Sequence, residues 1–269
     1  MGFKFLFIFL LITCSSICAI AQTHRLKKPI ICLTYDDGLE TQLSIVIPQL
    51  DSVGLKATFF LNSINGSAVS AIPGQTPEAV IGWINAAKHG HELGNHTLFH
   101  PCPEKLGWLK EASIDNYTVA RIIKEIATEN EILALLDPQN KTRSFAFPCN
   151  NVMIRDTDYS KIIKEKGLAK FARAGGDRNS IITDFKKLNT MQVPCWFVEP
   201  GTTLQELIDF AEKTKKVGGL GIYQIHGVGA QVFKITTETH RAFLAWLKKN
   251  EVDYEVTTFS AAMEIITKL

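Results

Sequence analysis

Strand and helix patterns alternate along most of the chain, and this alternation limits its fold more than any other feature. Apolar, β-rich runs bounded by turn residues lie at residues 30–35, 57–62, 91–95, 144–147, 167–173, 191–193, 220–225 and 254–257. Helical patterns lie between several of them, at residues 41–53, 77–88, 118–136, 203–216 and 237–250. Such alternation indicates parallel strands joined by crossover helices. Roughly eight strands in about 250 residues favour a TIM-like barrel over an open sheet. We therefore expect one α/β domain over residues 22–269.

The start of the chain has the pattern of a secretory signal peptide. A short positive start and an apolar run precede a small-x-small site that ends at Ala21, so we expect cleavage after Ala21 and a secreted or periplasmic protein. A retained membrane anchor is the weaker reading, because the apolar run is short and is interrupted by polar residues. Cys14 resembles a lipoprotein site, but Thr13 fits poorly before it. We expect no membrane span after cleavage.

Net charge and composition exclude some classes of partner. The net charge is +2, and the basic residues are dispersed among acidic ones, so we expect no nucleic acid partner. The apolar content of 46% indicates a globular body, not a disordered chain.

Two histidines and two aspartates carry the pattern of a metal site. His96 and His100 are four residues apart, so they would share one face if the chain turned helical after Asn95. Asp36 and Asp37 follow the first apolar run, and strand ends of this kind meet at the carboxyl rim of a barrel. One carboxylate could then bind the ion while the other accepts a proton from water. Taken alone, the histidine pair is a modest signal and Asp-Asp-Gly is usually a turn.

Two runs together resemble a known family. Thr34 to Gly38 reads TYDDG and His96 to Pro101 reads HTLFHP, similar to the first two motifs of the polysaccharide deacetylases, also called the NodB-homology or carbohydrate esterase family 4 domain. The resemblance implies an irregular (β/α) barrel in which Asp37, His96 and His100 bind a divalent metal. It also implies Asp36 as general base. The expected ion is Zn²⁺, although these ligands also accept Co²⁺, Ni²⁺ or Mn²⁺.

The third motif of the family departs from its usual form in this chain. Residues 144–149 read SFAFPC, with Ala146 where the family often has an Arg that contacts the base, and Cys149 in place of an aromatic residue. Arg143 or Arg173 could supply the missing cation, and we favour Arg173 because it ends a predicted strand. A cation beside Asp36 would keep it ionised as a base.

The last motif and the candidate substrate contacts are weaker signals. Residues 223–227 read YQIHG and resemble the motif in which a histidine acts as general acid, which implies that role for His226. Gln224 stands where the family often has a Leu that floors the acetyl pocket. Pro148, in the wall formed by the third motif, and Arg173 are candidate substrate contacts. Trp196 could stack on a sugar, although the chain's other tryptophans compete for that role.

Four cysteines remain after the expected cleavage, namely Cys32, Cys102, Cys149 and Cys195. They allow three pairings in an oxidising compartment, and the sequence does not choose among them. Cys102 and Cys149 lie at or just beyond site motifs, which makes a bridge between them a hypothesis to test. The alternative is that all four are free and buried.

The sequence thus predicts a metal-dependent hydrolase that removes N- or O-acetyl groups from a carbohydrate polymer or oligosaccharide. Two rivals stay open. The departures at Ala146, Cys149 and Gln224 are also compatible with a non-catalytic carbohydrate-binding relative. The second alternative is a small-molecule amide deacylase on the same scaffold.

Overall fold

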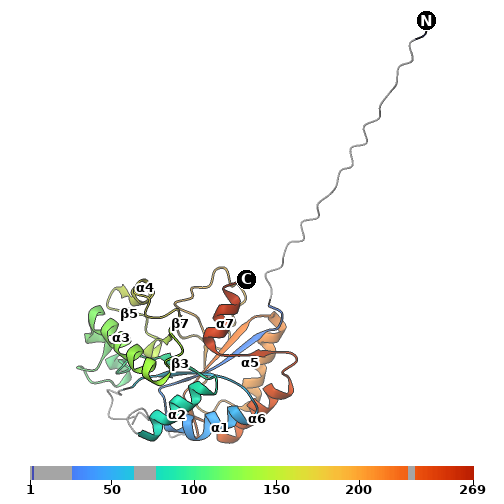
Figure 1. The fold of residues 1–269 in the computed structure, drawn as a ribbon, viewed down its shortest axis with the longest axis horizontal. Coiled ribbons are helices and arrows are strands. Elements are labelled where there is room, and N and C mark those ends of the chain that lie inside the picture. Colours follow the sequence, from blue (N-terminus) through green and yellow to red (C-terminus); the bar gives the residue numbers. More distant parts are fainter. Residues whose placement is uncertain (1, 3–25, 64–76, 230–233) are drawn as a thin grey trace.

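The computed structural model describes residues 2, 26–63, 77–229 and 234–269, and a sheet of eight strands forms the centre of this part of the chain (Figure 1). Its main strands lie in the order β7 (Phe171–Arg173), β4 (Ser144–Ala146), β3 (Glu92–Asn95), β2 (Thr58–Leu61), β1 (Ile30–Asp36), β9 (Leu220–Ile225) and β8 (Trp196–Phe197). The eighth strand, β12 (Glu255–Val256), pairs with the start of β1. All of these strand pairs are parallel. Every residue of β1 is buried, as expected of a parallel strand covered on both faces.

The sheet curls into a half-barrel. At one edge, Val193 forms a parallel bridge with Arg173 of β7, and a few residues later the chain enters β8 at the other edge. The predicted α/β barrel of one domain is therefore confirmed. The predicted strand at residues 191–193 is only this bridge, and β8 was not predicted. A strand of two residues is too short to show the alternation that identifies strands in a sequence.

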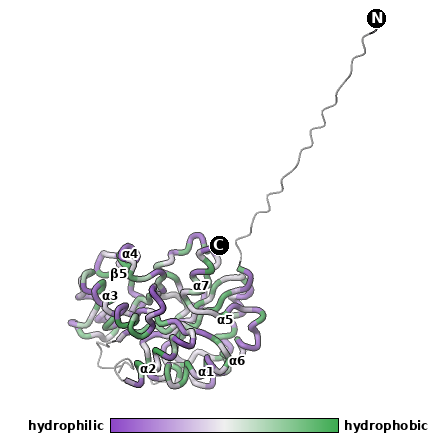
Figure 2. Tube along the Cα trace, in the orientation of Figure 1, coloured by the Kyte–Doolittle hydropathy of each residue, from purple (hydrophilic) through white to green (hydrophobic). Residues whose placement is uncertain are grey.

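Helices surround the sheet (Figure 1). They are η1 (Gln42–Val46), α1 (Ile47–Ser52), α2 (Pro77–Lys88), α3 (Val119–Leu136), α4 (Tyr159–Glu165), α5 (Leu204–Val217), α6 (Thr237–Lys249) and α7 (Phe259–Ile266). The five predicted helical segments are confirmed, with η1 and α1 sharing the first of them. The side chains of Thr118, Thr203 and Thr236 each accept a backbone hydrogen bond at the start of α3, α5 and α6. Figure 2 shows hydrophilic and hydrophobic residues mixed along α5 and α6, which is typical of helices with one face on the core.

Short elements fill the connections. They are η3 (Glu104–Leu106), η4 (Ile114–Asn116), η5 (Pro148–Asn150), the pair β5 (Met153–Ile154) and β6 (Thr157–Asp158), and the pair β10 (Gly227–Val228) and β11 (Lys234–Ile235). The expected signal peptide, residues 1–21, lies outside the described residues apart from Gly2. In the part of the chain that the structure describes, no helix has the length and apolarity needed to cross a membrane.

Glu129 on α3 is a buried carboxyl whose titration should appear in the stability of the fold. The backbone N–H and hydroxyl of Ser63 donate to it at 3.2 and 2.9 Å. Burial nevertheless raises its pKa from 4.5 to about 8. Because the folded pKa is the higher one, the stability linked to this proton is fully present below pH 4.5 and is lost as the pH rises through 8.

We therefore expect Glu129→Gln to gain stability relative to the wild type as the pH rises from about 5 to about 9, by up to a few kcal/mol. Urea unfolding at both pH values measures the difference. Glu131→Gln, on the exposed side of the same helix, is the matched control and should leave the pH dependence unchanged. If E129Q and the wild type differ by the same amount at both pH values, the pKa of Glu129 is not raised.

Candidate active site

Two aspartates lie where β1 ends and the chain makes a tight turn. Asp36 is the last residue of the strand, and Asp37 (φ 78°) and Gly38 (φ 62°) both adopt the left-handed region. Asp tolerates this region better than most residues, and Gly adopts it freely. The backbone N–H of Asp37 donates to the carbonyl of Phe60 at 3.1 Å, which fixes the turn to β2. The local sequence thus places two carboxyl groups at the carboxyl end of the strand.

His96 and His100 lie on a loop after β3, so the helical turn we considered for them is not present. Thr97 (φ 67°) and His100 (φ 49°) are left-handed, and side chains take the place of helical hydrogen bonds. The Asn95 side chain accepts from the N–H of Thr97 at 2.8 Å, and the Thr97 hydroxyl accepts from the N–H of His100 at 2.9 Å. Asn and Thr compete with helical backbone in this way. The loop still brings the two imidazoles together, with ring centroids 4.6 Å apart.

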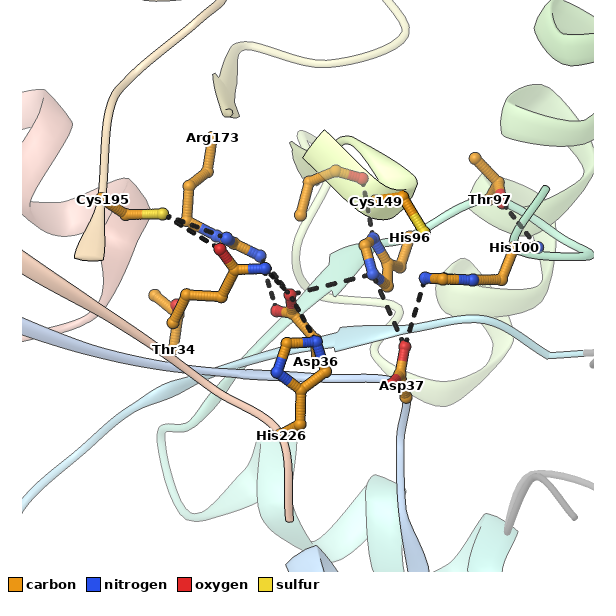
Figure 3. Close-up of polar contacts among 12 residues, drawn as sticks. Thr34, Asp36, Asp37, His96, Thr97, His100, Cys149, Arg173, Cys195 and His226 are labelled. Atoms are coloured by element: carbon orange, nitrogen blue, oxygen red, sulfur yellow. Dashed lines mark hydrogen bonds and ion pairs between the residues drawn. The ribbon is translucent and has the colours of Figure 1, made fainter. Parts of the chain in front are cut away.

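The structure brings the three predicted metal ligands together (Figure 3). Asp37 Oδ1 lies 3.3 Å from His100 Nε2 and 3.6 Å from His96 Nε2, and the three ligand atoms are within 4.8 Å of one another. Burial lowers the pKa of His96 to about 3 and that of His100 to about 4, so both rings are neutral and can donate a lone pair. Asp37 Oδ1 is buried and has no hydrogen-bond partner among the described residues. Two imidazoles and an unpartnered carboxylate oxygen fit a divalent ion such as zinc.

Neighbouring groups fix the orientation of both histidines. His96 Nδ1 donates to the Ala146 carbonyl at 2.8 Å, which leaves its Nε2 free to face Asp37. His100 Nδ1 lies 3.6 Å from the sulfur of Cys102. Cys102 is bonded to Cys149, with their Cα atoms 5.7 Å apart, so the hypothesis of this disulfide is confirmed. The bridge ties the loop after β3 to the loop after β4.

Asp36 is held by a buried cation. Arg173 Nη2 contacts both carboxylate oxygens, at 2.6 and 2.5 Å, and Gln224 Nε2 donates to Oδ2 at 3.0 Å. Burial alone would raise the pKa of Asp36, but the charge of Arg173 and the nearby histidines outweigh it and lower the pKa to about 2. The other candidate cation, Arg143, binds Asp137 at 2.9 Å instead. Asp36 is therefore ionised beside the candidate metal ligands.

The pKa of Asp37 shifts in the opposite direction, because nearby positive charges compensate less for its burial. Its pKa is raised to about 6 by burial and by the neighbouring charge of Asp36, against a lowering influence of His226 and Arg173. The adjacent carboxyls thus differ in proton affinity, which suits a division of roles between them.

His226 lies beside Asp36, as His96 does (Figure 3). Its Nε2 is 3.9 Å from Asp36 Oδ2, and its side chain is 12% exposed, so it can reach solvent or substrate. Gln42 Nε2 donates to the carbonyl oxygens of Asp36 at 2.6 Å and His226 at 3.2 Å, which fixes the two backbones relative to each other.

Sequence reasoning missed the supporting roles of three buried side chains, those of Gln224, Cys195 and Gln42. Arg173 Nη1 donates to the sulfur of Cys195 at 3.3 Å, and that thiol lies 3.3 Å from Gln224 Oε1, so the polar groups around Asp36 form a closed network. Gln42 is the third. A polar residue inside the apolar run of β9 was the one signal for Gln224, and nothing marked Gln42 or Cys195.

Two of the proposed substrate contacts are buried in the structure. Trp196 is completely buried, with its ring against Phe210 and its Nε1 bonded to Glu199 at 3.1 Å, so it has no face for a sugar. Pro148 is also buried. Arg173 is buried against Asp36 and acts through that carboxylate. Trp108 is the partly exposed tryptophan beside the site, and its Nε1 donates to the His100 carbonyl at 3.1 Å.

One protein family and several solved structures are similar to this chain. The family model described as "Polysaccharide deacetylase" matches residues 23–170. No curated protein matches the chain.

Solved structures of low identity share the fold. One is the Xyl-CE4 domain of a multidomain xylanase from the hindgut metagenome of Trinervitermes trinervoides, at 17% identity and a TM-score of 0.55, covering 90% of this chain and 91% of that chain. A family 4 acetyl xylan esterase from Clostridium thermocellum in complex with a cobalt ion is 19% identical, with a TM-score of 0.53 and coverage of 89% and 91%. A peptidoglycan N-acetylglucosamine deacetylase is 18% identical, with a TM-score of 0.56 and coverage of 88% and 89%. The matched motifs and the shared fold together show that the chain belongs to the polysaccharide deacetylase family, a family of carbohydrate esterases.

Proposed function

We propose that this protein is a metal-dependent hydrolase that removes acetyl groups from an acetylated carbohydrate, with Asp37, His96 and His100 as ligands of a zinc ion. One observation carries the proposal: the three ligand atoms lie within 4.8 Å of one another, beside an ionised carboxylate that is not itself among them. Co²⁺, Ni²⁺ and Mn²⁺ are alternatives for the same ligands.

The chain's own residues divide the remaining work. A divalent ion in this site supplies Lewis-acid activation of water and of the acyl carbonyl. Asp36, ionised because of Arg173, accepts the proton of the attacking water as general base. His226, within 3.9 Å of Asp36, donates a proton to the departing amine or alkoxide. Gln42 fixes Asp36 and His226 relative to each other, because its side chain donates to the backbone carbonyls of both.

The motif departures that suggested a non-catalytic relative each have a counterpart that supports catalysis. Arg173 supplies, from β7, the cation missing at Ala146. Cys149 serves as a disulfide partner of the histidine loop. Gln224 donates to Asp36, which favours the charged form of the base. These contacts favour an active enzyme over a binding relative.

Two of the similar structures suggest which substrates to test. They are an acetyl xylan esterase and a peptidoglycan N-acetylglucosamine deacetylase, so both ester and amide bonds belong in the test. We propose an acetylated polysaccharide outside the cell as the substrate, since residues 1–21 have the pattern of an export signal.

Acetate release from acetylated xylan, chitin oligosaccharides and peptidoglycan, with and without chelator, tests the proposal. We expect activity on at least one polymer, its loss on chelation, and its recovery when Zn²⁺ or Co²⁺ is returned. Activity that survives full demetallation would refute the metal-dependent scheme. Oligosaccharide binding without acetate release would favour the non-catalytic relative, and faster release from small acyl amides would favour the small-molecule deacylase.

A further inference from the structure

The Cys102–Cys149 disulfide lies against the ring nitrogen of His100 that faces away from Asp37. His100 Nε2 is 3.3 Å from Asp37 Oδ1, whereas its Nδ1 is 3.6 Å from the Cys102 sulfur. The ligand atoms of His100, Cys102 and Cys149 lie within 4.8 Å of one another. We propose that the disulfide masks a second metal site, which forms on reduction from these three residues and takes a thiophilic divalent ion such as Zn²⁺ or Cd²⁺.

The spacing of the atoms fits such an ion. Zinc binds sulfur at about 2.3 Å and imidazole nitrogen at about 2.0 Å, so tetrahedral geometry separates the two ligand atoms by about 3.5 Å. The 3.6 Å between Cys102 Sγ and His100 Nδ1 matches this separation. Cutting the sulfur–sulfur bond frees the Cys149 thiol to turn away from Cys102, while the Cα atoms, 5.7 Å apart, need not move.

The ligand set of His100, Cys102 and Cys149 also differs in chemical character from the set of Asp37, His96 and His100. Two thiolates and one imidazole select soft or borderline ions, whereas two imidazoles and a carboxylate accept harder ones. Because one imidazole belongs to both sets, occupation of the sulfur side acts directly on a residue of the proposed catalytic centre. The redox state of the bridge would thereby alter metal binding at that centre.

Formation of the site requires a reductant, which we take to be a dithiol. The dithiol gives two electrons and two protons to the bridge, so Cys102 and Cys149 become thiols while the dithiol becomes a disulfide. Binding of the ion then displaces one proton from each thiol. Cys102 is buried but Cys149 is partly exposed, which gives the reductant a route to the bridge.

Co²⁺ alone is the probe, because its bonds to thiolate give an intense charge-transfer absorption that its bonds to imidazole and carboxylate do not. The full chain is reduced, freed of reductant without air, and titrated with Co²⁺ beside the oxidised chain. We expect the thiolate absorption only in the reduced chain, at an intensity that corresponds to one thiolate-bound Co²⁺ per chain. Reduced Cys149→Ser should lose it, although this variant keeps Cys102 and the four cysteines outside the bridge; Cys102→Ser is a second variant of the same kind.

His96→Ala separates the two sites, since His96 belongs only to the proposed catalytic set. Reduced H96A should keep the thiolate absorption. Reduced H100A should need at least about tenfold more Co²⁺ to reach the same absorption, because the loss of a residue that only supports a metal ligand already weakens metal binding by about that factor. Absorption that persists in both Cys→Ser variants would assign it to other cysteines and overturn the proposal. Equal absorption in oxidised and reduced chains, or a reduced chain without its far-UV circular dichroism, would overturn it as well.

Discussion

Replacing Asp36 with Asn is expected to lower the rate of acetate release by about 10²–10⁴-fold, the usual contribution of a general base. Asn keeps the shape of the side chain and can still accept from Arg173 and Gln224, but it cannot take a proton from water. The metal ligands are unchanged, so the variant should bind Zn²⁺ with the wild-type stoichiometry. Steady-state kinetics and elemental analysis of the purified variant measure the two expectations.

Loss of activity in D36N has to be separated from loss of structure, because Asn leaves the buried Arg173 without a counter-charge. Activity is therefore compared at a temperature where circular dichroism shows the variant fully folded. Asp51→Asn is the matched control, since Asp51 pairs with Lys56 at 2.7 Å away from the catalytic cluster. A folded D36N that holds zinc and keeps wild-type kcat would remove Asp36 from the role of base.

Arg173→Met is expected to destabilise the fold by about 3–5 kcal/mol at neutral pH, because it leaves the charge of Asp36 buried and uncompensated. In the wild type the pKa of Asp36 is lowered to about 2, so its contribution to stability is present above the ordinary value of 3.8 and is lost as the pH falls through 2. Without Arg173, burial dominates and the pKa rises. Asp36 can then become neutral in the folded variant as the pH falls, so the destabilisation should be larger at pH 7 than near pH 4.

Urea unfolding of wild type and R173M at these two pH values measures that difference. In the pH profile of kcat/KM, the acid limb should move to higher pH in the variant. Arg143→Met is the matched control: Arg143 is also buried and ion-paired, at 2.9 Å from Asp137, but it does not contact Asp36. R143M should therefore lose stability and leave the acid limb in place. If R173M leaves the acid limb in place too, Arg173 does not set the ionisation of the base.

The sequence was informative where a pattern is local. The buried run of β1 and the amphipathic segments of α3 and α6 can be seen within a window of a few turns, so their positions were predicted to within one or two residues. Short elements such as β8 and α4 complete no such pattern, and they were missed.

The same distinction between local and long-range information applies to the candidate site. Motif spacing and family resemblance identified the two aspartates and the two histidines as a set, although the loop that presents the histidines has left-handed residues in place of the helical turn. The choice between Arg143 and Arg173 was not local. Arg173 meets Asp36 across 137 positions of sequence, because β7 and β1 belong to one curled sheet.

By itself, then, the sequence determined the class of fold, the order of its main elements and the residue types available for metal binding and proton transfer, because periodicity and short motifs are properties of neighbouring residues. Only the tertiary structure decided that Cys102 bonds to Cys149, that Trp196 is buried while Trp108 lies beside the site, and that Gln42, Gln224 and Cys195 complete the surroundings of the base and acid. Those contacts depend on how distant strand ends converge at the rim of the half-barrel, and this convergence is a consequence of the curvature of the whole sheet.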